Sequence, residues 1–225
     1  MNINKALIIA AHPDDDILGC GGIISNLKNS VDFKVAFIAE GTTCRYNQSD
    51  CQEAIEELKV RNGFAVQALN FLGVNQYSFY DLPCGKLDQT PLIKINKIIE
   101  KEIADFSPDT IFTHSNCDSN KDHHKVYDAT IIAARPQSCV KKLLSYEVLS
   151  STEWGFDKVF APNVFFPLTD FNVQEKWDAL KFYKTEIKKF PYPRSEKGIK
   201  TLAAYRGLQS GYKNAEAYRL IRGCM

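Results

Sequence analysis

Short apolar runs alternate with longer stretches of helical periodicity over about the first 150 residues of the chain. Uninterrupted apolar runs are typical of strands that are buried on both faces of a parallel sheet. We expect five of them, at residues 6–11, 33–39, 77–80, 110–113 and 143–149, with helices between them at residues 16–27, 50–71, 91–104 and 125–134. This alternation predicts an α/β fold, namely a Rossmann-like, doubly wound and mainly parallel sheet of about five strands with helices on both faces.

The alternation ends after Ser150. Aromatic residues and prolines gather in residues 160–168, where we expect an antiparallel hairpin, and helices are expected at residues 173–190 and 195–208. No repeat and no flexible linker interrupts the chain, so we expect one domain over residues 1–225. Its core covers about residues 1–150, and a C-terminal cap covers about residues 151–225. Within the core, Ser49 or Asp50 is the expected N-cap of the second helix.

The composition narrows the class of protein. The hydrophobic fraction of 44% and charged fraction of 24% are those of an ordinary globular protein. A net charge of +1 does not favour binding to nucleic acid or to an anionic membrane. No apolar run approaches the ~20 residues of a membrane helix, and the N-terminal segment lacks the apolar stretch of a signal peptide. Seven cysteines without a CxxC pair indicate reduced thiols, and we therefore expect a cytoplasmic protein.

Two polar segments that follow predicted strands hold all four histidines of the chain. The first is the turn after residues 6–11, and the second is the loop after residues 110–113. In doubly wound sheets, ligands bind beyond the carboxyl ends of the strands, where the strand order reverses. We therefore expect the fold to bring together the chemically active side chains of both segments, which are His12, Asp14, Asp15 and Asp16 in the first and His114, Asp118, Asp122, His123 and His124 in the second.

This set of side chains favours a divalent metal site. Two imidazoles and one carboxylate leave an open position on Zn²⁺ for water, which is the pattern of a catalytic site. A further carboxylate could take a proton from that water. A structural interpretation remains open, because a run of aspartates before a helix is also a good N-cap that the helix dipole favours. Nucleotide binding is disfavoured, since the carboxylates would repel a pyrophosphate and no GxGxxG motif is present.

The segment from Ala11 to Asp16, with the sequence AHPDDD, resembles the AHPDD signature of the PIG-L/LmbE-like family of zinc-dependent de-N-acetylases. A second family signature, an Asp-His pair followed by Val and Ala, is similar to Asp122-His123 with Val126 and Ala129. The resemblance extends over about residues 5–150. It implies a single PIG-L-like deacetylase domain that holds Zn²⁺, or another divalent metal, through His12, Asp15 and His123.

The resemblance also implies an activity. The chain would remove an acetyl group from a small-molecule partner, an N-acetylated amino sugar or glycoconjugate, by attack of zinc-bound water, with Asp14 as the general base. Asp122 is expected on the substrate side, where it would orient a neighbouring group. Arg45 resembles the family's substrate-contacting arginine, although it is equally consistent with an ordinary exposed loop residue. The alternatives are a non-catalytic metal- or glycan-binding homologue and a hydrolase of another N-acyl amide. The oligomeric state is left open.

One departure from the family pattern affects the catalytic assignment. Many members carry a histidine three residues before the metal-binding histidine, whereas this chain has Asn120 there. An amide can donate a hydrogen bond to an oxyanion but cannot deliver a proton. Either His114 or His124 supplies the proton, or Asp14 acts first as base and then as acid. We expect His114 to assist the proton transfer. The alternative is that His114 only supports a neighbouring residue or lies at the surface.

Overall fold

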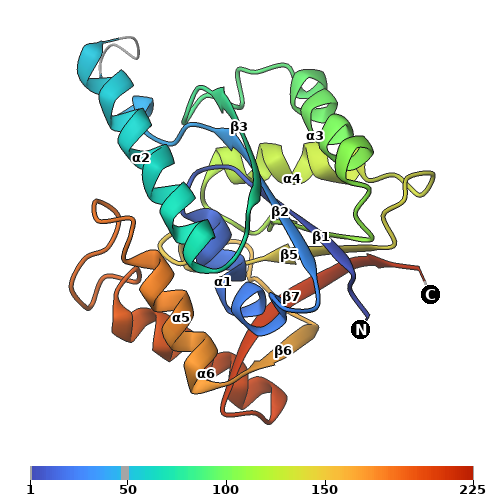
Figure 1. Ribbon diagram of the computed structural model, residues 1–225, viewed down its shortest axis with the longest axis vertical. Helices are drawn as coiled ribbons and strands as arrows, with labels where there is room; N and C mark the ends of the chain where they lie inside the picture. Colours follow the sequence, from blue (N-terminus) through green and yellow to red (C-terminus); the bar gives the residue numbers. More distant parts are fainter. Residues whose placement is uncertain (1, 47–50, 225) are drawn as a thin grey trace.

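A seven-stranded sheet in the order β3-β2-β1-β4-β5-β7-β6 forms the centre of the molecule (Figure 1). The computed structural model describes residues 2–46 and 51–224. The strands are β1 (Lys5–Ala10), β2 (Asp32–Ala39), β3 (Gln76–Leu82), β4 (Thr110–His114), β5 (Lys142–Tyr146), β6 (Val164–Leu168) and β7 (Asn214–Gly223). The helices are α1 (Asp15–Leu27), α2 (Gln52–Phe71), α3 (Leu92–Phe106), α4 (Lys121–Ala133), α5 (Asp170–Leu180) and α6 (Glu196–Ser210), with short 3-10 turns η1 (Thr43–Arg45) and η2 (Thr152–Trp154).

The predicted α/β class is confirmed. Strands β1 to β5 pair in parallel, and their order is that of a Rossmann-like sheet. The expected number of strands was too low, because the C-terminal third adds β6 and β7 to the same sheet. The expected local hairpin at residues 160–168 is also wrong: β6 pairs antiparallel with β7, which lies far along the chain and in turn pairs with β5.

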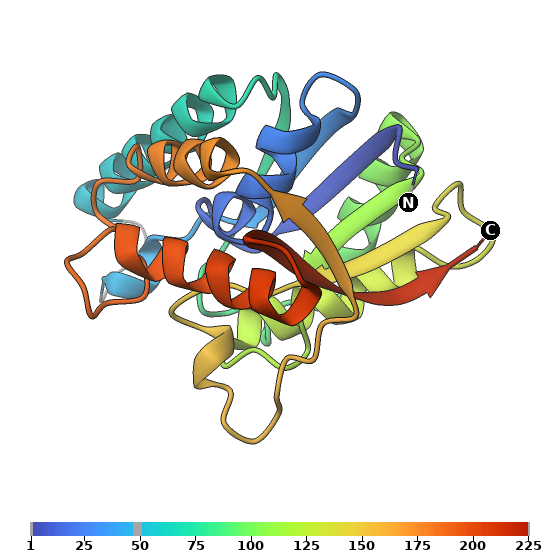
Figure 2. The same ribbon diagram turned by 90° about the horizontal axis from the view of Figure 1, so that it is seen from below.

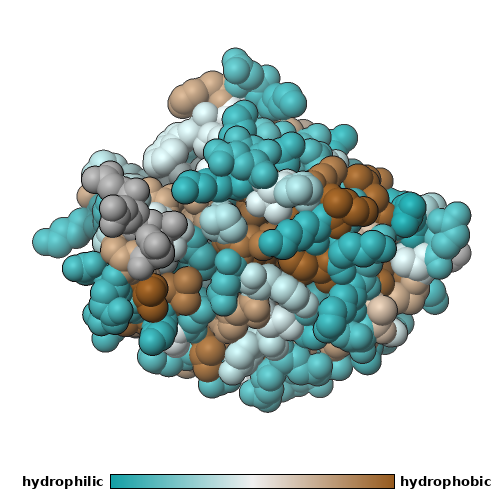
Figure 3. Space-filling view, turned by 90° about the horizontal axis from the view of Figure 1, so that it is seen from above, coloured by the Kyte–Doolittle hydropathy of each residue, from teal (hydrophilic) through white to brown (hydrophobic). Residues whose placement is uncertain are grey.

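Helices cover both faces of the sheet. Figure 2 shows α5 and α6 side by side on the face that also carries α1 and α2, whereas α3 and α4 cover the opposite face. The regular spacing of Ile95, Ile99 and Ile103 explains this packing for α3, since all three side chains are buried against the sheet. Seen from above in Figure 3, the surface is mostly hydrophilic, and the hydrophobic residues gather in small patches.

Some element bounds differ from those expected. Helix α4 begins at Lys121 and not at residue 125, so Asp122 and His123 lie in its first turn and not in a loop. Helix α5 ends at Leu180, ten residues before the expected end. The expected N-cap of α2, Ser49 or Asp50, lies outside the described residues. No helix in residues 2–46 and 51–224 combines the length and apolar character needed to cross a bilayer.

The reversal of strand order places two loops beside each other. Strand β1 lies between β2 and β4, and the register pairs Ala6 with Thr110 and Ile8 with Phe112. Because the two strands are parallel, the turn after β1 and the loop after β4 leave the sheet at the same edge. The hydroxyl of Tyr146 in β5 donates to the carbonyl oxygen of Ile9 at 2.8 Å. This hydrogen bond links β5 to the end of β1 across the intervening strand β4.

Candidate metal centre

The turn after β1 is held by its own backbone. The Asp15 amide donates to the carbonyl of His12 at 3.2 Å, and the His12 amide donates to Oδ2 of Asp15 at 2.9 Å. Asp14 adopts φ 115°, a conformation that costs a residue other than glycine about 1–3 kcal/mol. Helix α1 begins directly afterwards and anchors the turn. The side chains of His12, Asp14 and Asp15 therefore point in different directions from a fixed backbone.

The second part of the centre lies at the start of α4. Asn120 caps this helix, because its side-chain oxygen accepts the amide of Asp122 at 2.9 Å. The cap places His123 in the first turn. The imidazole of His123 stacks on that of His114, the last residue of β4, with ring centroids 3.9 Å apart. His114 is fixed in turn, since its Nε2 accepts the amide of Ala11 at 2.8 Å.

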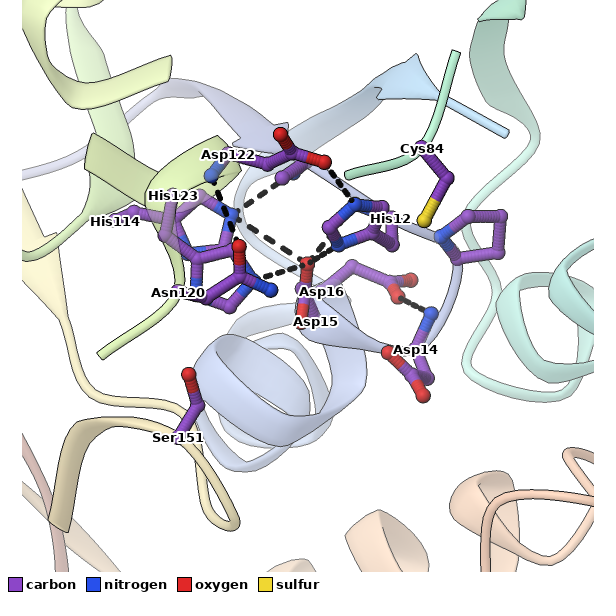
Figure 4. A network of polar contacts seen from close by, with 12 residues as sticks. His12, Asp14, Asp15, Asp16, Cys84, His114, Asn120, Asp122, His123 and Ser151 are labelled. Atoms are coloured by element: carbon purple, nitrogen blue, oxygen red, sulfur yellow. Dashed lines mark hydrogen bonds and ion pairs between the residues drawn. The ribbon is translucent and has the colours of Figure 1, made fainter. Parts of the chain in front are cut away.

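Three possible metal ligands converge at this point. Oδ2 of Asp15 lies 3.4 Å from Nδ1 of His12 and 3.3 Å from Nε2 of His123. The ligand atoms of these three residues all lie within 4.8 Å of one another, and all three residues are buried. Figure 4 shows their side chains together, with Asp122 and Asn120 beside them. Cys84 and Asp122 form a second possible group with His12, which the two groups share.

Carboxylates behind the imidazoles orient them. Nε2 of His12 and Oδ2 of Asp122 are 2.9 Å apart, and Nδ1 of His123 lies 3.1 Å from Oδ2 of Asp118. These contacts leave Nδ1 of His12 and Nε2 of His123 facing Asp15. A carboxylate on the remote nitrogen of a ligating histidine is the usual arrangement around metals in proteins.

The electrostatics of the centre favour a cation. Burial lowers the pKa of His123, but Asp15 and Asp118 outweigh it and raise that pKa to about 10. Burial likewise opposes charging of His12, yet Asp122 and Asp15 raise its pKa above the ordinary value. Burial raises the pKa of Asp15, but His123 and His114 outweigh it and hold that pKa well below its usual range. A buried set of two imidazoles and one carboxylate that attracts positive charge fits Zn²⁺ or a similar divalent ion.

Asp14 lies next to this group and is paired with two arginines. Its Oδ2 is 3.1 Å from Nη2 of Arg61 and 2.5 Å from Nη1 of Arg194. Its Oδ1 has no hydrogen-bond partner among the residues that the structure describes. Burial raises the pKa of Asp14 to about 6, although Arg194 and Arg61 oppose that rise. One oxygen is therefore fixed and the other is free to accept a proton.

A small cavity of about 180 Å³ opens over these groups. Arg45 stands at its edge with 40% of its side chain exposed, and it is paired with Glu57 at 2.9 Å and Glu186 at 2.8 Å. The wall is polar and contains both signs of charge. The lining residues are His12, Asp14, Asp15, Gly41, Cys44, Arg45, Arg61, Cys84, Asn120, His123, Ser150, Ser151, Glu186 and Arg194.

His114 and Asp122, which were expected to act in catalysis and on the substrate side, do not line the cavity. His114 is completely buried behind His123, and burial holds its pKa well below the usual value. The oxygens of Asp122 accept from the amides of Gly85 and Leu87 in addition to facing His12. This geometry does not support proton delivery by His114. The contact of Asp122 with His12 agrees with the expected orienting role, although it does not place Asp122 on the substrate side. Both residues lie behind the possible metal ligands.

Three charged residues of the cavity were absent from the expected site. Arg61 comes from the middle of α2, and Glu186 and Arg194 come from the segment between α5 and α6. Nη1 of Arg61 and Oε1 of Glu186 are 2.6 Å apart, so the set forms one network with Asp14. The spacing of residues along the chain could not predict that these charged residues belong to the site, because their neighbours there come from remote parts of the chain.

Comparison with known proteins gives a consistent result. The family model described as "PIG-L: GlcNAc-PI de-N-acetylase" matches residues 7–134. A diacetylchitobiose deacetylase from Thermococcus kodakarensis is 24% identical over 233 residues, which cover 99% of this chain and 85% of that protein. The structure of N,N'-diacetylchitobiose deacetylase from Pyrococcus horikoshii has a TM-score of 0.79 at 19% identity, over 99% of this chain and 85% of that chain.

The same fold also occurs in an enzyme of another class. GalB, the 4-carboxy-2-hydroxymuconate hydratase of Pseudomonas putida KT2440, has a TM-score of 0.73 at 18% identity, over 99% of this chain and 98% of that chain. The fold therefore does not define the reaction, which depends on the residues of the site.

Proposed function

Because this chain belongs to the PIG-L family of GlcNAc-PI de-N-acetylases, we propose that it is a metal-dependent hydrolase that removes the acetyl group from an N-acetylated amino sugar or sugar conjugate. Its homologues include deacetylases of N-acetylated sugars. The single observation that carries the proposal is the placement of Asp14, which lines the same cavity as His12, Asp15 and His123 and whose Oδ1 has no hydrogen-bond partner among the described residues.

His12, Asp15 and His123 would hold the metal, with Zn²⁺ as the expected ion. A divalent metal bound by such residues supplies Lewis acidity, which lowers the pKa of water and polarises an acyl carbonyl. Asp122 and Asp118 keep the two imidazoles in the required orientation. His114 supports His123 from behind through ring stacking, which replaces the proton-donating role that the sequence suggested.

Asp14 is the proposed general base and acid. Its Oδ1 accepts a proton as a water oxygen attacks the carbonyl carbon, while Arg61 and Arg194 hold Oδ2 in place. The bond between the carbonyl carbon and the amide nitrogen then breaks, and the proton on Asp14 passes to that nitrogen. The products are acetate and a free amine. No second titratable group is needed for this cycle, which accommodates Asn120 in place of the family histidine.

Asn120 is the proposed donor to the oxyanion. Its side-chain oxygen is fixed by the amide of Asp122, so the NH₂ group is turned away from the helix and remains available at the cavity. An amide donor placed in this way stabilises the negative charge that develops on the carbonyl oxygen. Arg45 and Glu186, at the edge of the cavity, would contact the hydroxyl groups of the sugar. The cytoplasm remains the expected location.

The test is acetate release from a panel of N-acetyl sugars and of their disaccharide, nucleotide and lipid conjugates. Zinc-loaded protein is compared with metal-stripped protein, with Asp14→Ala and with Asp157→Ala, whose exposed carboxylate serves as the control. We expect release that requires zinc and Asp14 but not Asp157. Metal-loaded, folded protein that releases no acetate across the panel would contradict the proposal and favour a binding protein or another amide. Release that survives Asp14→Ala would contradict the assigned base.

A further inference from the structure

Two thiols from different loops meet at the rim of the cavity. Cys44 lies in η1 after β2, and Cys84 lies in the turn after β3, 40 residues later. Their sulfur atoms are 3.0 Å apart. Cys44 is exposed, whereas Cys84 is buried beside His12 (Figure 4). No other pair of cysteine sulfurs is in contact within residues 2–46 and 51–224.

The contact between the thiols is built into the fold. The carboxylate of Glu40, just after β2, accepts the amides of Thr42 at 2.6 Å, Thr43 at 2.9 Å and Cys84 at 2.7 Å. One buried carboxylate therefore ties the Cys44 loop to the Cys84 loop. Gly85 has φ +69°, and a Cβ atom there would lie 3.2 Å from Cβ of Cys44. A larger residue at this position would crowd the Cys44 loop away from Cys84.

The two thiols differ in the way that a reacting pair requires. Cys44 is exposed, so a peroxide can reach its sulfur, whereas Cys84 is buried and its sulfur lies 3.0 Å from that of Cys44. Accessible thiolates are the cysteines that peroxides oxidise first.

We propose that Cys44 and Cys84 form a reversible disulfide when the protein meets a peroxide. The Cys44 thiolate attacks one oxygen of hydrogen peroxide, which breaks the O–O bond and gives a sulfenic acid and hydroxide. The sulfur of Cys84 then attacks the Cys44 sulfur. Water leaves with the proton from Cys84, and an S–S bond forms. Two thiols and one peroxide give one disulfide and two waters. The sulfurs need to approach by about 1 Å to reach the S–S bond length.

The disulfide would act on the metal centre through a short path. Cys84 precedes Gly85, whose amide donates to Oδ2 of Asp122 at 2.6 Å, and the same oxygen faces Nε2 of His12. Movement of the Cys84 turn toward Cys44 would pull on this contact and disturb the orientation of His12. A loss of activity on oxidation follows only if the proposed deacetylase function holds, whereas formation of the disulfide does not depend on it.

The test is thiol mapping on the zinc-loaded protein after limited treatment with hydrogen peroxide. Trypsin should release residues 35–45 joined to residues 62–86, with a mass lower by two hydrogens than the sum of the separate peptides. Reduction by dithiothreitol should restore both free peptides. Cys44→Ser and Cys84→Ser should each abolish the joined peptide, whereas Cys139→Ser, which removes an exposed cysteine elsewhere, should retain it.

Three results would overturn the proposal. The first is oxidation of Cys44 to the sulfinic acid without a joined peptide in the wild-type protein. The second is a disulfide that joins either cysteine to another partner. The third is a pair that resists peroxide until zinc is removed, which would assign both thiols to metal binding. A deacetylase assay on the same samples should show an about tenfold or larger loss that dithiothreitol reverses. Disulfide formation without that loss would show that oxidation does not affect the activity. The disulfide between Cys44 and Cys84 would still be confirmed.

Discussion

The carboxylate of Asp122 holds the imidazole of His12, with Oδ2 2.9 Å from Nε2. Because that nitrogen is engaged, Nδ1 of His12 is the atom that faces Asp15. Asp122 also accepts two amides from the turn after β3, so it is itself fixed. The orientation of one expected ligand therefore depends on a residue that does not reach the cavity.

Replacing Asp122 by asparagine should weaken zinc binding. The amide removes the negative charge behind His12, and the expected loss of metal affinity is about 10- to 100-fold. Competition with a chromophoric chelator measures this affinity without an activity assay. Asp128→Asn, an exposed change on the same helix, is the control and should bind zinc like the wild type. Unchanged affinity in Asp122→Asn would refute the orienting role.

Replacing Arg194 by glutamine should reduce turnover and preserve the metal. Arg194 contacts Asp14 but none of the three expected ligands, and it is one of the two cations at Oδ2. We expect a fall in kcat/KM of about tenfold or more, since each 1.36 kcal/mol is a factor of ten and a buried charge would lose a partner. Arg135→Gln, which removes an exposed ion pair, is the control. A variant with full activity, or one that has lost its zinc, would contradict this assignment.

Two glycine substitutions should have opposite effects on the free energy of unfolding. A Cβ atom at Gly19 would overlap the ring of Tyr146, whose hydroxyl holds the edge of β1. Gly19→Ala should therefore destabilise the protein by about 1–3 kcal/mol. Gly63 is also helical but has open space around it, so Gly63→Ala should stabilise by about 0.5–1 kcal/mol.

Urea denaturation measures both glycine variants and checks that the slopes agree. A neutral Gly19→Ala variant would show that the ring of Tyr146 can move aside without cost. It would also mean that the contact between α1 and β5 is less tight than the structure indicates.

Alkylation of Cys44 should report its lowered pKa. The thiolate is the reactive form, so a pKa lowered to about 6 means that the rate rises as the pH passes upward through 6. Removal of the hydrogen bond in Cys84→Ala should shift this rise toward the ordinary value of about 8.5. Mass spectrometry of residues 35–45 after short iodoacetamide pulses gives the rate, and Cys139 in the same sample is the reference. The same profile in both proteins would show that Cys84 does not set the reactivity of Cys44.

The pattern of the sequence predicted the class of fold, and the resemblance of its two motifs to a known family supplied the expected metal ligands. Continuous apolar runs such as residues 6–11 carry their own signal, because a strand buried on both faces needs apolar side chains at every position. Adjacent residues in a turn after a strand also have a predictable place at the edge of a parallel sheet. The edge rule predicted that the two segments meet, and the resemblance to the PIG-L family selected His12, Asp15 and His123 among their side chains. The ligand atoms of these three residues lie within 4.8 Å of one another.

Other features depend on contacts between segments that are remote in the chain. Strand β7 was not predicted, because Glu216 and arginines interrupt its apolar pattern. It is a strand because it pairs with β5 on one side and with β6 on the other. The pairing of Asp14 with Arg61 and Arg194 joins three remote segments, as does the meeting of Cys44 with Cys84. Long-range contacts of this kind are set by how helices and loops pack over the sheet. They cannot be predicted from the spacing of residues along one segment.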